Sequence, residues 1–188
     1  YYNVEISGSL QIGNNDEDLV GFTFGNQSPL GVPVDSFNCW MIDWKQADEG
    51  CMLEGYSLHK LNGIIPYNSN LISSSFWCKT DDPPIFDVVN TLYGPGTGWA
   101  QGVVHNFKLA YTSNKMILIM NGDTIFNRTD SFQSGRFGFY AGSQNQATFS
   151  NISRRPYADF KISNDSICHQ DMAEFILFDT SIYDNLVA

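Results

Sequence analysis

Hydrophobic and polar residues alternate along most of this chain, as they do in β-strands that bury one face. In residues 3–13, the apolar side chains Val4, Ile6, Leu10 and Ile12 fall on the same face. Similar short runs predict further strands at residues 19–25, 39–46, 55–61, 106–111, 137–140 and 148–152. No stretch sustains a period of 3.6 residues, so the pattern predicts no amphipathic helix.

The clearest hairpin is predicted at residues 115–127. Two apolar runs flank Asn121-Gly122, a pair that tolerates positive φ at both central positions of a type I′ turn. Residues 80–98 contain Pro83, Pro84 and Pro95 and are predicted to be mainly loop. Short strands at near-regular spacing, without helices between them, indicate an all-β sandwich of antiparallel sheets.

A domain boundary is predicted near Ser153, which divides the chain into residues 1–153 and 154–188. Beyond Pro156 a new alternation begins, with Phe160 and Ile162 as its first apolar positions. A segment this short is too small for an independent β domain, so it either packs on the sandwich or opens a second, truncated module. The chain also begins at Tyr1-Tyr2 within a strand pattern, and we expect it to be part of a longer multidomain protein.

The composition narrows the function classes. Twenty acidic and ten basic residues among 188 give a formal net charge of −10, which argues against a nucleic-acid partner and leaves a cation as a candidate. Hydrophobic residues make up 43% of the chain, so it is not a disordered acidic tail. No apolar run approaches the roughly 20 residues that a membrane-spanning helix needs, and no membrane span is predicted.

The four cysteines, Cys39, Cys51, Cys78 and Cys168, have no zinc-site spacing. In a secreted protein they would form one or two disulfides, and Cys51 with Cys78 is the preferred pair. Free buried thiols are the alternative. Four N-x-S/T triplets on a Ser- and Asn-rich chain also suit an extracellular protein, either secreted or at the cell surface.

The strongest chemical feature is the segment Asn14-Asn15-Asp16-Glu17-Asp18, where five oxygen-bearing side chains occupy one turn between two predicted strands. Hard cations such as Ca²⁺ take six to eight oxygen ligands, often several from one loop. A solvated turn is the alternative, because Asn and Asp favour turns in any case.

Three motifs carry a resemblance to a known family. They are the acidic stretch from Asp16 to Gly25, the W-K-Q at Trp44 to Gln46, and the G-R-F-G-F-Y of Gly135 to Tyr140. In these motifs, residues 3–152 resemble the C-terminal L-type-lectin-like domain of thrombospondins and its bacterial relatives. The resemblance implies a concanavalin-like antiparallel jelly-roll sandwich with calcium at the acidic turn.

Carried over by position, the resemblance implicates Asp16, Glu17 and Asp18 as calcium ligands. Glu17 stands where the family has a middle Asp, and Leu19 stands where it usually has Tyr. Asn14 and Asn15 are further candidates because they adjoin the turn, and Asn145 is a weaker candidate in a Ser-Gln-Asn-Gln turn.

The segment after Pro156 has its own resemblance. Its A-D-F-x-I-S-N-D-S-I-C run is similar to the opening of PKD-type (polycystic-kidney-disease-type) β-sandwich modules. This implies that Cys168 pairs with a cysteine beyond Ala188.

No constellation of catalytic residues stands out. Laminarinase-type hydrolases of this fold place their two carboxylates on one strand as E-x-D-x-x-E, whereas Asp43 here lacks both flanking glutamates. Tyr93 and Trp99 border a Pro/Gly loop and are candidates for stacking on sugar faces, the alternative being that they cap the core.

Together these observations predict a non-catalytic, extracellular, Ca²⁺-dependent adhesion or glycan-recognition module of a larger surface protein. Its expected partner is a cell-surface or matrix glycan or protein. A structural or protein-binding spacer without a glycan site is one alternative, and a polysaccharide hydrolase of the same fold is another.

Overall fold

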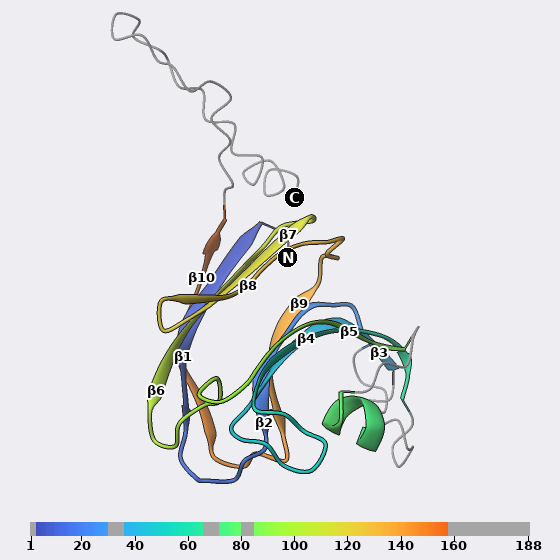
Figure 1. Cartoon of the computed structure of the whole chain (residues 1–188). Helices are drawn as coiled ribbons and strands as arrows, with labels where there is room; N and C mark the ends of the chain where they lie inside the picture. Colours follow the sequence, from blue (N-terminus) through green and yellow to red (C-terminus); the bar gives the residue numbers. More distant parts are fainter. Residues whose placement is uncertain (1–2, 30–35, 66–71, 80–84, 158–188) are drawn as a thin grey trace, which may run out of the picture.

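The computed structural model describes residues 3–29, 36–65, 72–79 and 85–157, and these form a sandwich of two antiparallel sheets (Figure 1). The first sheet has the strand order β10-β1-β6-β7-β8, and the second has the order β5-β4-β3-β2-β9. The strands are β1 (Val4–Ile12), β2 (Leu19–Asn26), β3 (Ser36–Lys45), β4 (Gly55–Ile64), β5 (Phe86–Tyr93), β6 (Val104–Tyr111), β7 (Lys115–Met120), β8 (Asp123–Thr129), β9 (Arg136–Gly142) and β10 (Ala147–Pro156). The predicted all-β antiparallel sandwich is therefore the observed fold class.

The main core lies between the two sheets. The predicted apolar face of β1 is buried, and it meets alternating side chains from β2 and β3. The aromatic residues among them include Phe22, Phe24, Trp40 and Trp44. Burying a large apolar side chain contributes about 1.5–3 kcal/mol, so each of these aromatic residues stabilises the sandwich.

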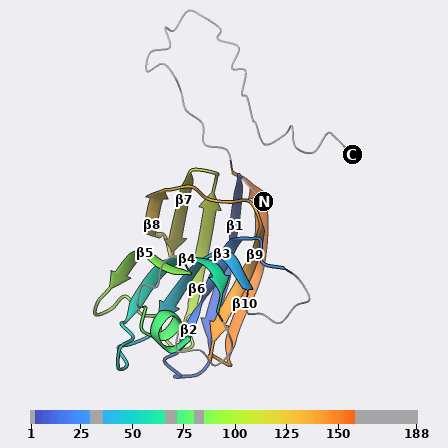
Figure 2. The ribbon, with the colours of Figure 1, turned by 90° about the vertical axis from the view of Figure 1, so that its right-hand side faces the viewer.

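A second apolar cluster lies on the outer face of the second sheet. The six-residue π-helix η1 (Ile72–Trp77) covers this face, as Figure 2 shows, with the Phe76 ring centroid 5.5 Å from that of Phe86 and 5.7 Å from that of Phe37. Cys39 and Met41 of β3 are buried beneath it. Because β3 is covered on both faces, its sequence is a nearly continuous apolar run instead of an alternation.

The strands and the hairpin predicted from the sequence are confirmed, with shifts at their ends. Asn121 and Gly122 have φ values of 54° and 97°, as the predicted turn between β7 and β8 requires. The prediction of a loop over residues 80–98 was wrong in part, because β5 occupies Phe86–Tyr93 and pairs with β4. The helix η1 was also missed.

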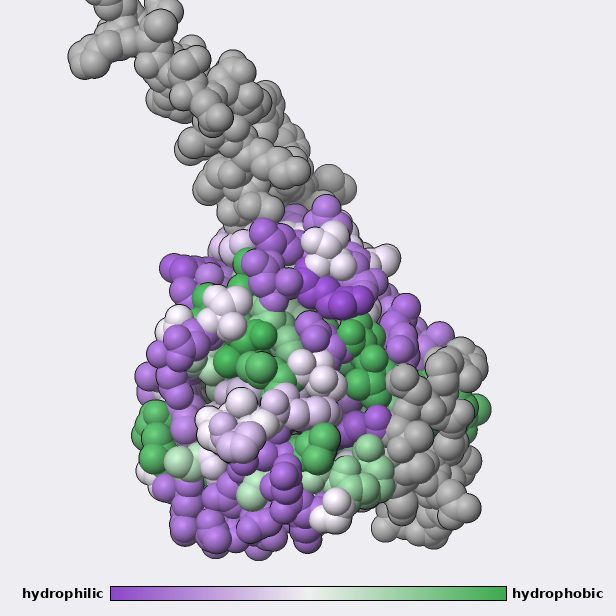
Figure 3. Space-filling model, viewed as in Figure 1, coloured by the Kyte–Doolittle hydropathy of each residue, from purple (hydrophilic) through white to green (hydrophobic). Residues whose placement is uncertain are grey.

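The last strand of the sandwich runs through the segment in which a domain boundary is predicted. Strand β10 continues past Ser153 to Pro156, which pairs with Val4 of β1. The predicted second module, including Cys168, lies outside the described residues. Within the described part of the chain, no helix is long and apolar enough to cross a membrane. Figure 3 shows apolar residues in the middle of the face seen in Figure 1, with hydrophilic residues around them.

Candidate functional site

The acidic turn joins β1 to β2 at one end of the sandwich, the lower end in Figure 1. Its first residues are fixed by the neighbouring turn that joins β9 to β10. The Gly13 N–H donates to the Gln146 carbonyl at 3.0 Å, and the Asn14 amide donates to Asn145 Oδ1 at 3.0 Å. The structure therefore brings together two of the predicted metal candidates, Asn14 and Asn145.

Side chains from other elements hold the remainder of the turn. Lys45, which is 2% exposed, donates to the Glu17 carbonyl and lies 3.1 Å from Glu49 Oε2. Gln46 donates to Asn15 Oδ1 at 3.0 Å, and Gln144 donates to the Asp16 carbonyl. The strand β3 thus ends in side chains that fasten the turn.

The three carboxylates of the turn do not converge. Asp16 is exposed, whereas Glu17 and Asp18 are partly buried. Among the described residues, no group of three His, Cys, Asp or Glu side chains is placed to hold one metal ion. Burial raises the pKa of Asp18 and the Asp16 charge adds to this rise, although Ser143 and Lys45 oppose it. A cation beside Asp18 would relieve this penalty.

Amide oxygens complete the donor set of the turn. Asn14 Oδ1, Gln46 Oε1 and Gln144 Oε1 are buried without a hydrogen-bond partner. Each belongs to an amide whose nitrogen donates to the turn or to its neighbour. Neutral carbonyl oxygens and carboxylates are the ligands that Ca²⁺ takes, and an unpaired buried oxygen costs about 1–3 kcal/mol. The amide oxygens and the Asp18 carboxylate are thus of the ligand types that Ca²⁺ takes.

The two aromatic candidates for sugar binding differ sharply. Trp99 is 2% exposed and belongs to the core between the sheets, with its indole nitrogen 3.4 Å from the Asp18 carbonyl. The assignment of Trp99 to sugar binding was therefore wrong, because its ring offers no open face. The alternative considered for it, capping of the core, describes its position.

Tyr93, at the end of β5, lies instead beside a cavity on the outer face of the second sheet. The cavity has a volume of about 170 Å³. It is lined by Cys51, Leu53, Cys78, Lys79, Val88, Thr91 and Tyr93. Burial raises the pKa of the Tyr93 hydroxyl, and the charge of Asp43 adds to this rise, so the side chain is a neutral phenol at pH 7. The lining therefore combines one aromatic ring, one ammonium group and the hydroxyl groups of Tyr93 and Thr91 with apolar side chains.

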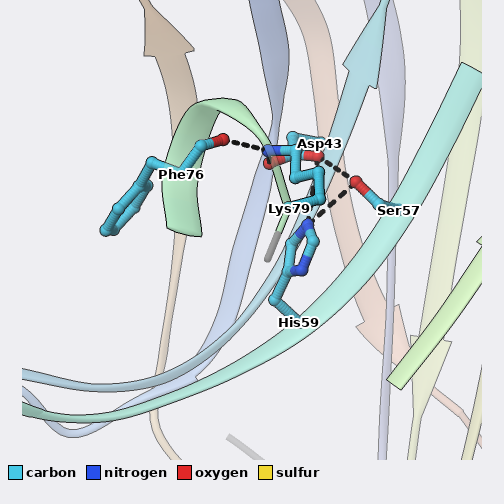
Figure 4. Close-up of polar contacts among 5 residues, drawn as sticks. All are labelled: Asp43, Ser57, His59, Phe76 and Lys79. Atoms are coloured by element: carbon cyan, nitrogen blue, oxygen red, sulfur yellow. Dashed lines mark hydrogen bonds and ion pairs between the residues drawn. The ribbon is translucent and has the colours of Figure 1, made fainter. Parts of the chain in front are cut away.

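Lys79 belongs to a buried polar cluster, which Figure 4 shows. The Lys79 ammonium is 2.5 Å from Asp43 Oδ2 and 2.5 Å from the Phe76 carbonyl oxygen. The Ser57 hydroxyl donates to Asp43 Oδ1, and His59 Nε2 lies 3.2 Å from the same oxygen and 2.8 Å from Ser57 Oγ. Burial alone would raise the pKa of Asp43, but the Lys79 and His59 charges and hydrogen bonds hold it well below its ordinary value.

This cluster has the residue types of a hydrolytic triad without its geometry. In such a triad, the carboxylate and the serine contact different nitrogens of the imidazole. Here Asp43 and Ser57 both lie at Nε2 of His59, and all three side chains are at most 1% exposed. Asp43 is thus a buried counter-ion of Lys79.

A disulfide forms part of the cavity wall. Cys51 and Cys78, the pair favoured from the sequence, are bonded with their Cα atoms 5.0 Å apart. Cys39 is a free, buried thiol, and burial raises its pKa to about 12. The disulfide attaches the η1 segment, and with it Lys79, to the loop between β3 and β4.

That loop connects the two candidate sites. Its first side chain, Gln46, contacts the acidic turn, whereas Cys51 and Leu53 line the cavity. At the end of this loop, Glu54 Oε1 accepts hydrogen bonds from the Gly96 and Gly98 N–H groups at 2.7 and 2.9 Å.

Several of these residues were not predicted from the sequence. Lys79, His59 and Ser57 carry no local motif, and they meet through strand pairing and the disulfide. The sequence indicates only weakly that Lys45 and Gln46 contact the acidic turn. They follow an apolar strand, and the preceding strand of the chain starts directly after the acidic turn.

Comparison with solved structures finds proteins of similar fold. Carbohydrate-binding module CBM66 from Bacillus subtilis matches with a TM-score of 0.54 and 12% identity, over 82% of this chain and 75% of that one. Sheep galectin-11 in complex with glycerol matches with a TM-score of 0.49 and 7% identity, over 81% of this chain and 88% of that one. The alginate lyase AlyA1 from Zobellia galactanivorans matches with a TM-score of 0.39 and 16% identity, over 83% of this chain and 62% of that one.

Of these three, CBM66 alone exceeds a TM-score of 0.5, and at 12% identity it shows the fold alone. It supports the predicted lectin-like jelly-roll sandwich. No family model matches the chain, and a search of curated proteins gives no match. The resemblances to the thrombospondin C-terminal domain and to PKD-type modules therefore stay predictions.

Proposed function

We propose that this protein is an extracellular glycan-recognition module that binds sugars without catalysis. The observation that carries the proposal is the cavity beside Tyr93 on the outer face of the second sheet. The solved structure with the highest similarity reported above, CBM66, is by its name a carbohydrate-binding module. The disulfide between Cys51 and Cys78 suits the oxidising conditions outside the cell.

The lining of the cavity suits the chemistry of a sugar. A sugar ring has apolar C–H faces and a rim of hydroxyl groups, so it needs apolar surface beside a few directed polar groups. Tyr93, Leu53 and Val88 supply the apolar surface, and Thr91 and Lys79 supply hydrogen-bonding groups. An aromatic ring with a polar edge is well suited to such a position.

Binding is favoured over hydrolysis by the state of Asp43. Asp43 is the carboxylate that the sequence offers as a catalytic candidate. It is buried and contacts Lys79, Ser57 and His59 through its two oxygens. An acid catalyst must reach the substrate oxygen and exchange a proton near neutral pH. A buried carboxylate whose pKa is held low can do neither.

Calcium at the acidic turn is the second part of the proposal. Asp18, together with the amide oxygens of Asn14, Gln46 and Gln144, would hold the ion, with Asp16, Glu17, Asn15 and Asn145 as further candidates. Bound Ca²⁺ would supply the positive charge that the turn lacks. Because Gln46 begins the loop that forms the cavity wall, ordering of the turn would fix that wall before a glycan binds.

A glycan array, followed by titration of each hit, tests the sugar site. Tyr93→Ala should weaken binding at least tenfold, whereas Leu92→Ala, a change at the neighbouring residue that does not line the cavity, should leave it unchanged. Silence on a broad array would favour a protein-binding spacer. Release of reducing sugar that disappears in Asp43→Asn would favour a hydrolase.

Thermal unfolding tests the calcium site without reference to glycans. Tm should rise with added CaCl₂ and fall with a chelator, and Asp16→Ala or Asp18→Ala should reduce this shift. Asp87→Ala, a change on the exposed side of β5, is the matched control. A Tm that responds to neither Ca²⁺ nor chelator would refute calcium binding and leave the sugar site standing.

A further inference from the structure

The cavity beside Tyr93 has a lining whose charge is opposite to that of the chain. Among the described residues that line it, Lys79 is the one ionised side chain, and neither Asp nor Glu is present. The chain as a whole has twenty acidic and ten basic residues. A ligand that enters the cavity therefore meets a positive charge on a protein that is otherwise acidic.

The buried carboxylate of Asp43 reduces this positive charge without cancelling it. Asp43 lies 2.5 Å from the Lys79 ammonium, is 1% exposed and does not belong to the lining. Its other oxygen is held by Ser57 and His59, so the carboxylate stays at the far end of the ion pair. Because the Coulomb interaction falls with distance, an anion in the cavity is attracted by the nearer ammonium more than it is repelled by the carboxylate.

The hydrogen-bonding groups of the lining also suit an anion. A carboxylate accepts hydrogen bonds and donates none. The Asp43 and Phe76 oxygens take two of the three Lys79 donors, and the third remains for a ligand. Burial raises the pKa of the Tyr93 hydroxyl, so this group is a neutral donor at pH 7, and the Thr91 hydroxyl is a further donor. The Lys79 side chain is 9% exposed, so water competes little for its charge.

Position and volume limit the ligand further. Lys79 adjoins Cys78, which is bonded to Cys51, so its backbone is held in place before a ligand arrives. The volume of about 170 Å³ lies below the roughly 300–1,000 Å³ of pockets that take drug-sized molecules, and it suits a single ring. We infer that the cavity takes one uronic acid unit, whose carboxylate contacts Lys79 while its ring packs against Tyr93; this rests on the proposed function and names its substrate class.

Calorimetry and saturation-transfer NMR at pH 7 test the charge preference with matched sugars. D-Glucuronic acid, which is ionised at this pH, is compared with D-glucose and with its own methyl ester, which has nearly the same shape and no charge. The ionised acid should bind at least tenfold more tightly than either neutral sugar, and acetate at the same concentration should not displace it. Equal binding of the three sugars, or displacement by acetate, would overturn the inference and leave glycan recognition intact.

Two sets of variants place the preference in this cavity. Thr91→Glu adds a carboxylate to the lining, and its preference for the ionised acid should be at least tenfold lower than that of Thr91→Gln, which has nearly the same shape. Lys79→Met/Asp43→Asn removes both charges of the ion pair together and should bind the acid and its methyl ester equally. An undiminished preference in either Thr91→Glu or the double variant would overturn the inference. Failure of every sugar and of the glycan array would refute the proposed function itself.

Discussion

Opening the disulfide between Cys51 and Cys78 should destabilise the sandwich by about 3.5 kcal/mol. The bond spans a sequence separation of 27 residues. In the chain-entropy model, a loop of about this length removes roughly 12 cal/mol/K from the unfolded ensemble, or about 3.5 kcal/mol at 25 °C. For a domain of this size, the loss corresponds to a fall in Tm of roughly 7–14 °C.

The effect should also reach the cavity. Cys78 adjoins Lys79, whose contact with Asp43 neutralises a buried carboxylate. Without the disulfide, the η1 segment is held to the sheet mainly by the packing of Phe76 against Phe37 and Phe86 and by this ion pair. Glycan affinity should therefore fall under conditions in which the sheets remain folded.

Urea unfolding followed by tryptophan fluorescence measures the stability, with and without a dithiol reductant. The double variant Cys51→Ser/Cys78→Ser should match the reduced protein, and reductant should have no effect on it. Coincident unfolding curves for the oxidised and reduced wild-type protein would refute the reasoning. A loss confined to stability, with affinity unchanged, would refute the coupling to the cavity.

Three further predictions concern charge and packing. Asp43→Asn should cost about 3–5 kcal/mol in urea unfolding at pH 7, because it leaves the Lys79 charge buried without its partner. Because the pKa of Asp43 is lower in the folded than in the unfolded chain, its contribution to the free energy of unfolding is present above a pH of about 4 and is lost as the pH falls further. The free energy of unfolding of Asp43→Asn should therefore depend less on pH between pH 5 and pH 2 than that of the wild-type protein. An equal pH dependence of the two proteins would contradict this. Asp18→Asn should raise Tm in the presence of chelator, because burial raises the pKa of this carboxyl and penalises its charge. The same change should remove the rise in Tm on addition of Ca²⁺. A Tm in chelator below that of the wild-type protein would count against this explanation. Leu118→Ala, a change in the core at β7, should lower the free energy of unfolding by about 2–5 kcal/mol. A loss below about 1 kcal/mol would show that the core relaxes to fill the space left by the removed side chain.

Much of the fold was predictable because its signals are local. The face of β1 follows from alternation within nine residues, and the turn at Asn121-Gly122 follows from the preference of this pair for positive φ. Strand β5 was not predictable in this way. Its neighbouring prolines indicate a loop, and its pairing with β4 depends on residues about 30 positions earlier in the chain.

The residues of the candidate site likewise differ in whether local sequence could predict them. Tyr93 and Trp99 border the same loop and have the same chemistry in sequence, yet one lines a cavity and the other lies in the core. Only the path of the chain distinguishes them. Lys79 gave no signal in the sequence, because its role depends on Asp43 of strand β3 and on the disulfide beside it.

The pairing of β1 with β10 has a consequence for how this sandwich can be joined to other chains. The Tyr157 N–H donates to the Asn3 carbonyl at 2.7 Å, so the described chain enters and leaves at one point. A unit whose ends meet in this way can replace a surface turn of a host domain without stretching it, and its ends can be joined by a short linker. Circular permutation through Asn121-Gly122 should therefore preserve the fold, because the new ends would open an exposed hairpin turn.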